Sequence, residues 1–149
     1  MTYPREPERK PIRILIVDGN ADFLQVATDF LQRRLGLHVV GTLTRVQDSL
    51  AWIRSLDPHV ILLDLDTPGH AGLESIPHLK ATMPGVSIIA LTLSSSSAYE
   101  GAARAAGADA LVSKAALLCD LLPAIRQVSG SGIFQADRIV PGIVPAAGP

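Results

Sequence analysis

Residues 59–69 read HVILLDLDTPG, an apolar run that ends in two aspartates and a Thr-Pro-Gly turn. A short, nearly continuous run of valine, isoleucine and leucine is typical of a β-strand buried on both faces. Asp64 and Asp66 stand at the end of this run, in a chain with only 18% charged residues. The segment therefore predicts a central strand whose carboxyl end binds a cation or a phosphoryl group.

The segments on either side of this run alternate between short apolar stretches and longer stretches with helical periodicity. Strands are expected at 12–18, 38–43, 59–65, 86–92 and 109–114, and helices at 21–36, 45–56, 71–83, 97–107 and 116–128. Strands that alternate with helices of roughly 10–15 residues predict right-handed parallel crossovers with helices on both faces of the sheet. The expected fold class is α/β, a doubly wound five-stranded parallel sheet.

The two ends of the chain differ in composition from this body. Residues 1–11 mix three prolines with charged side chains and are expected to form a disordered arm before a domain at 12–128. Residues 129–149 are rich in glycine and proline and carry three apolar pairs, so we expect a flexible tail. Such a tail could fold back on the domain, meet a second copy in a homodimer, or extend freely.

Composition restricts the class of protein. The chain is 48% hydrophobic with a formal net charge of -1, which gives no electrostatic reason to expect nucleic acid or a membrane as a partner. Cys119 is the only cysteine, so neither an internal disulfide nor a zinc cluster is expected. No stretch reaches the roughly 20 apolar residues of a membrane helix, and the first residues lack the apolar core of a signal peptide. We expect a cytoplasmic protein.

Polar residues end four of the predicted strands. Asp18, Asp64, Thr92 and Lys114 follow the first, third, fourth and fifth strands. The carboxyl ends of neighbouring parallel strands share one edge of the sheet, so these side chains are expected to converge. Phosphoryl transfer to a carboxylate needs a nucleophilic aspartate, a divalent cation, and hydroxyl and ammonium donors. The set predicts a phosphoryl-transfer site.

Five segments, in order, resemble the motifs of the receiver domain of response regulators in bacterial two-component signalling. They are ILIVDG at 14–19, VILLDLDTPGHAGLE at 60–74, SIIALT at 87–92, AGADALVSK at 106–114 and LLPAIRQV at 121–128. The resemblance covers residues 12–128. It implies a flavodoxin-like (βα)5 fold, similar to that of the chemotaxis regulator, with strand order 2-1-3-4-5.

The resemblance also implies roles by position. Asp64 would be the phosphoacceptor, Thr92 the switch hydroxyl and Lys114 the partner of the phosphoryl group. Mg²⁺ would be bound by Asp18, Asp64 and the backbone carbonyl of Asp66. A histidine kinase or a phosphotransfer protein would donate the phosphoryl group, and a downstream protein would recognise the altered surface.

Two positions depart from the family pattern. Gly19 stands where a second acid usually binds the metal, which predicts weaker Mg²⁺ binding. A carboxylate about 4 Å from a unit charge is worth up to roughly 4 kcal/mol at an effective dielectric constant near 20, although Mg²⁺ readily keeps water in place of a lost ligand. Asn20 or the side chain of Asp66 is expected to compensate in part. Leu111 replaces the aromatic switch residue. This predicts that phosphorylation is coupled only weakly, or not at all, to the surface that a downstream protein recognises.

Three functions follow as hypotheses. The first is a receiver that accepts a phosphoryl group on Asp64 and signals through protein contacts, without a DNA-binding output domain and without enzymatic turnover beyond self-dephosphorylation. The second is a degenerate receiver that binds partners without phosphorylation, as Gly19 and Leu111 suggest. The third is a phosphatase similar to the haloacid dehalogenases, which share the Asp-x-Asp signature. That family carries the signature on its first strand, whereas two strand-helix units precede it here.

Overall fold

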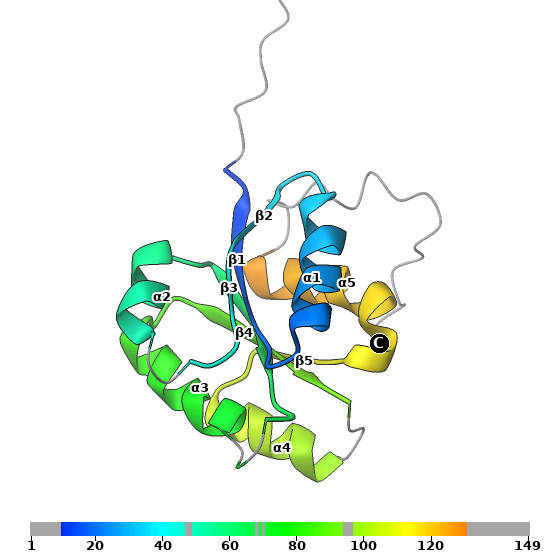
Figure 1. Ribbon diagram of the computed structural model, residues 1–149. Helices are drawn as coiled ribbons and strands as arrows, with labels where there is room; N and C mark the ends of the chain where they lie inside the picture. The colour runs from blue at the N-terminus through cyan, green and yellow to red at the C-terminus, as the bar shows by residue number, and fades with distance from the viewer. Residues whose placement is uncertain (1–9, 47–48, 68, 70, 94–96, 131–149) are drawn as a thin grey trace, which may run out of the picture.

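The computed structural model describes residues 10–46, 49–67, 69, 71–93 and 97–130, and strands alternate with helices throughout this part of the chain (Figure 1). The strands are β1 (Ile12–Val17), β2 (Leu37–Leu43), β3 (Val60–Asp64), β4 (Ser87–Thr92) and β5 (Ala110–Ser113). The helices are α1 (Ala21–Gln32), α2 (Leu50–Leu56), α3 (Ala71–Thr82), α4 (Ser97–Ala106), the 3₁₀ turn η2 (Lys114–Ala116) and α5 (Leu117–Ser129).

All strand pairs are parallel, and the sheet has the order β2-β1-β3-β4-β5. The predicted fold class and strand order are therefore confirmed. Of the expected arm and tail, residues 1–9 and 131–149 lie outside the described residues. Lys10, Pro11 and Gly130 are described and exposed.

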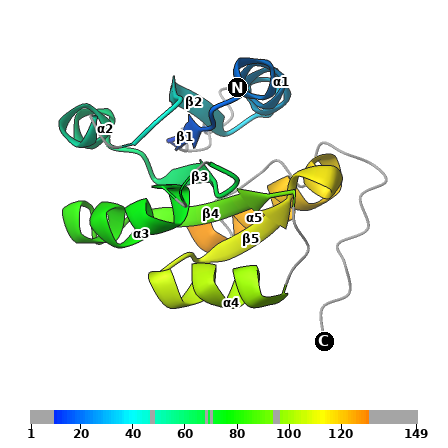
Figure 2. The same cartoon turned by 60° about the horizontal axis from the view of Figure 1, so that its bottom comes forward.

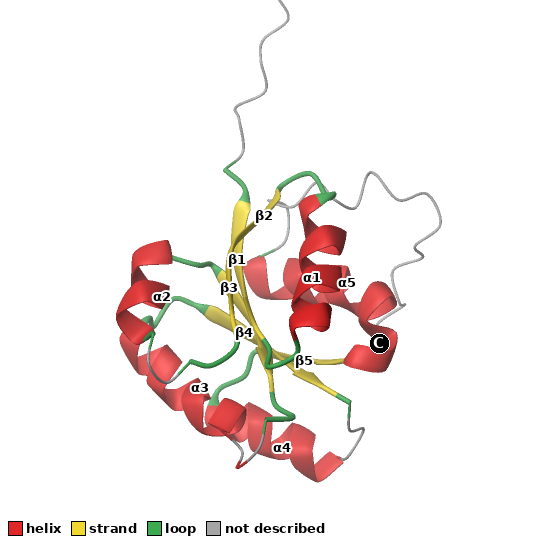
Figure 3. Cartoon of the chain, in the orientation of Figure 1, coloured by secondary structure: helices red, strands yellow, loops and turns green. Residues whose placement is uncertain are grey.

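Helices cover both faces of the sheet. Helices α1 and α5 pack on one face, and α2, α3 and α4 on the other (Figures 2 and 3). Successive residues of a strand point to opposite faces, so β1 divides its side chains between the two layers. Ile14 and Ile16 pack with α1 and α5, whereas Leu15 and Val17 pack with the other three helices.

Strand β3 lies between β1 and β4, and every one of its residues is buried. This position explains the apolar run at 60–63, because both faces of a central strand are covered by helices. It also explains why Asp64 is only 6% exposed. Burying a carboxylate is costly unless it is paired and hydrogen-bonded, so the end of β3 requires partners from neighbouring strands.

Two helices are shorter than expected by several residues. The helix expected at 21–36 ends at Gln32, and a turn follows in which Gly36 has a φ of 83° and its carbonyl accepts from the amide of Ile12. The helix expected at 45–56 begins at Leu50, after Ser49 as its N-cap. Residues 47–48 of that expected helix lie outside the described residues.

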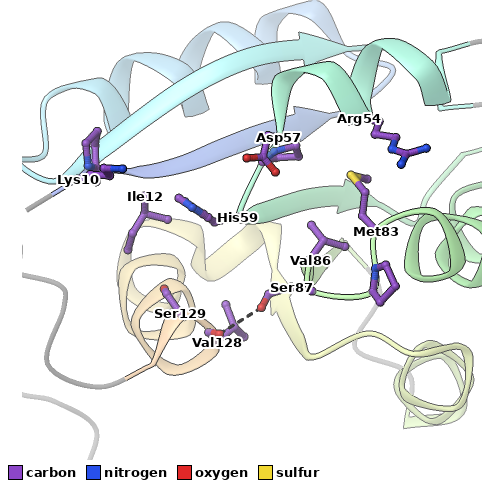
Figure 4. A pocket seen from close by; sticks show the side chains of 14 residues that line it. Lys10, Ile12, Arg54, Asp57, His59, Met83, Val86, Ser87, Val128 and Ser129 are labelled. Atoms are coloured by element: carbon purple, nitrogen blue, oxygen red, sulfur yellow. Dashed lines mark hydrogen bonds between the residues drawn. The ribbon is translucent and has the colours of Figure 1, made fainter.

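The amino ends of the strands form a cavity of about 980 Å³ on the opposite edge of the sheet from Asp18 and Asp64 (Figure 4). Lys10, Arg54 and His59 line it on one side, and the hydroxyl of Ser87 donates to the carbonyl of Val128 on the other, at 3.1 Å. Because its lining residues all lie at this edge, the cavity is separate from the predicted phosphoryl-transfer site.

Candidate functional site

Three of the predicted residues meet at the carboxyl ends of β1, β3 and β5. The ammonium nitrogen of Lys114 lies 2.6 Å from Oδ2 of Asp18 and 3.0 Å from Oδ1 of Asp64. The side chains are 11%, 1% and 7% exposed for Lys114, Asp18 and Asp64, respectively. The ammonium of Lys114 therefore forms ion pairs with two buried carboxylates at the carboxyl ends of the strands.

Backbone amides fix the orientation of both carboxylates. The amide of Asn20 donates to Oδ1 of Asp18 at 2.8 Å, and the amide of Asp66 donates to Oδ1 of Asp64 at 3.0 Å. In each case an aspartate at a strand end accepts from the amide two residues later, which is the geometry of an Asx turn. The turns that follow β1 and β3 therefore hold the carboxylates of Asp18 and Asp64 in place.

Lys114 remains charged in this environment. Burial by itself would lower the pKa of its ammonium, but the hydrogen bonds and charges of Asp18 and Asp64 outweigh burial and raise the pKa above its ordinary value. The ring of Phe23 lies 4.6 Å from the ammonium nitrogen and adds a cation-π contact. The site therefore holds a permanent positive charge beside Asp64 at neutral pH.

Thr92 is buried at the end of β4, and its hydroxyl donates to the Asp66 carboxylate. The distance from Oγ1 of Thr92 to Oδ1 of Asp66 is 3.2 Å, and the amide of Leu93 donates to Oδ2 of the same carboxylate at 2.6 Å. We call these two hydrogen bonds the Asp66 bridge. No local sequence pattern predicts the contact between Asp66 and Thr92, because Thr92 lies on another strand and 26 residues away.

Two further contacts hold the backbone between Asp64 and Asp66. The hydroxyl of Tyr99 on α4 donates to the carbonyl of Leu65 at 2.7 Å, and the amide of Leu65 donates to the carbonyl of Leu91 at 2.9 Å. Burial raises the pKa of the Tyr99 hydroxyl, and the charges of Asp66 and Asp64 raise it further. Tyr99 is a residue of this site that the sequence analysis missed, since no motif marked it.

Gly72 sets the distance between α3 and the end of β3. A Cβ on this residue would overlap the backbone carbonyl oxygen of Asp64, and its amide donates to Oγ1 of Thr67 at 2.9 Å. We expect Gly72→Ala to lower the free energy of unfolding by about 1–3 kcal/mol, because α3 or the Asp64 backbone must move. Urea unfolding followed by circular dichroism measures this.

Gly101 is the matched control for that substitution. It lies on the exposed face of α4, and a Cβ there meets no described atom within 4 Å. Gly101→Ala is expected to raise stability by up to about 1 kcal/mol, as alanine does in place of glycine within a helix. Equal effects of the two substitutions would show that the close approach at Gly72 is unimportant.

Gly19 leaves open space beside the two acids. A Cβ on Gly19 would meet no described atom within 4 Å, and Gly19 and Asp64 both line a cavity of about 370 Å³. Arg45, from the loop after β2, lines the same cavity. The place of the family's second acid is thus physically available but carries no ligand.

The donor set suits Mg²⁺ only in part. The oxygens of Asp18 and Asp64 are the hard ligands that Mg²⁺ prefers. Within the described ranges, however, no group of three or more histidine, cysteine or acidic side chains is arranged to hold a metal ion. The compensation expected from Asn20 finds no support, because its Oδ1 caps α1 by accepting from the amides of Asp22 and Phe23. The carboxylate of Asp66, the other side chain expected to compensate for Gly19, already accepts the two hydrogen bonds of the Asp66 bridge.

The model of the response regulator receiver domain family matches residues 14–126, which is most of the chain. The chain belongs to the response-regulator receiver family. The receiver is 31% identical over 133 residues to the response regulator GacA of Pseudomonas protegens, a match that covers 89% of this chain and 62% of that relative. It therefore spans about 60% of the length of the curated relatives it matches.

Solved structures agree with this assignment. A two-component response regulator of the LuxR family from Aurantimonas superposes with a TM-score of 0.74 at 26% identity, covering 80% of this receiver and 85% of that chain. The BeF3-activated DrrB receiver domain superposes with a TM-score of 0.66 at 28% identity, covering 80% and 97%. Within the part of the receiver that the structure describes, we find no helix with the length and apolar character needed to cross a membrane.

Proposed function

We propose that the receiver accepts a phosphoryl group on Asp64 from a histidine kinase or a phosphotransfer protein and signals to a downstream protein. The contact that carries the proposal is the one between Lys114 and Asp64, 3.0 Å long and largely shielded from water. A fixed ammonium beside a buried carboxylate stabilises the charge that develops on the transferring oxygens. Asp64 ends β3, the third strand, which disfavours the phosphatase hypothesis because that family carries its signature on the first strand.

The geometry also suggests which oxygen of Asp64 reacts. Lys114 and the amide of Asp66 both act on Oδ1. In the proposed step Oδ2 attacks phosphorus, a new bond forms between that oxygen and phosphorus, and the phosphorus bond to the donor breaks. The donor leaves with the electron pair of that bond. The chain then holds the phosphoryl group until water removes it, so the receiver is a phosphoacceptor and not a turnover enzyme.

Mg²⁺ would be held by the carboxylates of Asp18 and Asp64 and by the backbone carbonyl of Asp66. When bound it supplies positive charge to the incoming phosphoryl oxygens. We expect this binding to be weak, since Lys114 already neutralises part of the charge of Asp18 and Asp64 and Gly19 contributes no ligand. Weak metal binding slows phosphorylation without changing the identity of the acceptor.

The test is phosphorylation by acetyl phosphate with Mg²⁺, followed by intact-protein mass spectrometry. We expect a mass increase of one phosphoryl group in the wild-type receiver and none in Asp64→Asn. Asp120→Asn is the control, because Asp120 is an exposed acid on α5 that makes none of the contacts described for the site. A wild-type receiver that gains no mass, or an Asp64→Asn variant that still does, refutes the proposal.

A second function rests on the same geometry. The open space at Gly19 and the ammonium already placed between Asp18 and Asp64 are the features expected of a degenerate receiver that binds partners without phosphorylation. No mass increase and no Mg²⁺-dependent beryllofluoride binding in the folded wild-type protein would favour this function over the first.

A further inference from the structure

The Asp66 bridge joins the loop after β3 to the end of β4. Asp66 itself is exposed, whereas Thr92 is 1% exposed, so a surface carboxylate reaches a buried hydroxyl. In the β3–β4 register Asp64 pairs with Leu91, which places Thr92 and Leu93 directly after the residue beside the proposed acceptor. The two donors of the bridge therefore belong to the first two residues after the one that pairs with the proposed acceptor.

A phosphoryl group on Asp64 is an anion that requires hydrogen-bond donors. Hydroxyl and amide donors aimed at the transferring oxygens provide that stabilisation, and charge-assisted hydrogen bonds of this kind are about twice as strong as neutral ones. In the structure, the hydroxyl of Thr92 and the amide of Leu93 already donate to a carboxylate. A new anion at Asp64 can use them only after the Asp66 carboxylate gives them up.

We propose that the side chain of Asp66 is a positioning residue that competes with the phosphoryl group for Thr92 and Leu93, and so restrains the receiver in its unphosphorylated form. The inference rests on the proposed function at Asp64. It gives the second acid of the Asp-x-Asp pair a side-chain role besides the metal contact proposed for its backbone carbonyl.

The loop side of the bridge is anchored to α4. Tyr99 donates to the carbonyl of Leu65, the residue before Asp66, and the Leu65 amide is bonded to β4. Tyr99 and Leu111 belong to the same apolar layer on the sheet face that α4 covers. Release of the Asp66 bridge would thus remove a restraint on a loop that α4 contacts through Tyr99. This offers a route from the site to α4 that does not need an aromatic ring at position 111.

The experiment compares beryllofluoride binding, at saturating Mg²⁺, in the wild-type receiver, Asp66→Ala and Asp66→Asn. Asp66→Ala removes both acceptors and is expected to bind beryllofluoride about tenfold more tightly, the change expected when competition from one or two hydrogen bonds is lost. Asp66→Asn removes the charge and keeps one acceptor oxygen, so an intermediate gain is expected. Asp120→Ala removes an exposed acid on α5 and is expected to bind as the wild type does.

A second readout does not depend on phosphorylation chemistry. The amide of Leu93 is expected to exchange its hydrogen with solvent faster in Asp66→Ala, because its acceptor is gone, while the amide of Leu65 keeps its bond to Leu91. If hydrogen exchange at Leu93 is faster but beryllofluoride binding is unchanged or weaker, the proposed competition between Asp66 and the phosphoryl group is refuted. The proposed function at Asp64 is not affected by that result. If neither the wild type nor any variant binds beryllofluoride, the proposed function fails and the competition fails with it.

Discussion

Gly19→Asp is expected to raise the affinity of the receiver for Mg²⁺ by about tenfold or more. The substitution places a carboxylate beside Asp18 and Asp64, where a Cβ meets no described atom within 4 Å, so the added side chain causes no overlap. A carboxylate near the ion is worth up to roughly 4 kcal/mol before water is displaced, and about 1.4 kcal/mol of net gain is enough for tenfold tighter binding. Calorimetric Mg²⁺ titration of both proteins measures the change.

Gly85→Asp is the matched control for this prediction. Gly85 precedes β4 at the opposite edge of the sheet, and its Cβ position is also open. The variant adds the same charge to the molecule without adding a ligand, so its Mg²⁺ affinity is expected to equal that of the wild type. Equal affinities in Gly19→Asp and Gly85→Asp would mean that Gly19 does not limit metal binding.

Lys114→Met is expected to lower the free energy of unfolding by about 3–5 kcal/mol at neutral pH. Methionine keeps much of the side-chain volume but removes the charge, which leaves Asp18 and Asp64 buried without their shared cation. Removing one partner of a buried ion pair typically costs this much, because the remaining charge is uncompensated. Urea unfolding of the two proteins gives the difference directly.

Arg104→Met provides the control for the loss of a positive charge. Arg104 pairs with Glu100 on the surface of α4, at 3.4 Å and with both side chains about half exposed. Exposed pairs of this kind contribute only about 0.3–0.5 kcal/mol. If Lys114→Met costs no more than Arg104→Met, the two buried aspartates are not held by Lys114.

The pH dependence of the Lys114 contribution has a definite sign. The pKa of Lys114 is raised in the folded receiver above the ordinary value of 10.5. A group whose pKa rises on folding stabilises the folded state fully below its unfolded pKa and loses that contribution as pH rises through its folded pKa. The stability difference between wild type and Lys114→Met is therefore expected to shrink at pH values above about 10.5, and a constant difference would contradict this.

Several features of the receiver could be predicted from sequence because they depend on local patterns. The apolar run at 60–63 predicts a central strand, since only a strand covered on both faces has no polar side. Asp18, Asp64 and Lys114 end three strands, and the parallel sheet brings such ends to one edge. Their convergence was therefore predictable from the strands alone, although the strand order came from the family resemblance.

Other features depend on distances between elements that no local pattern encodes. The sequence shows Asp66 two residues after Asp64. Only the pairing of β3 with β4 brings the Asp66 carboxylate within hydrogen-bond distance of Thr92 and Leu93. Tyr99 reaches Leu65 because α4 packs on the same face of the sheet as α2 and α3. The side chain of Asn20 is used as the N-cap of α1. The sequence alone determined the sheet and the three charges at its edge. Tertiary structure decided which donors those carboxylates bind, because hydrogen bonds form only within about 3 Å and such distances are set by packing.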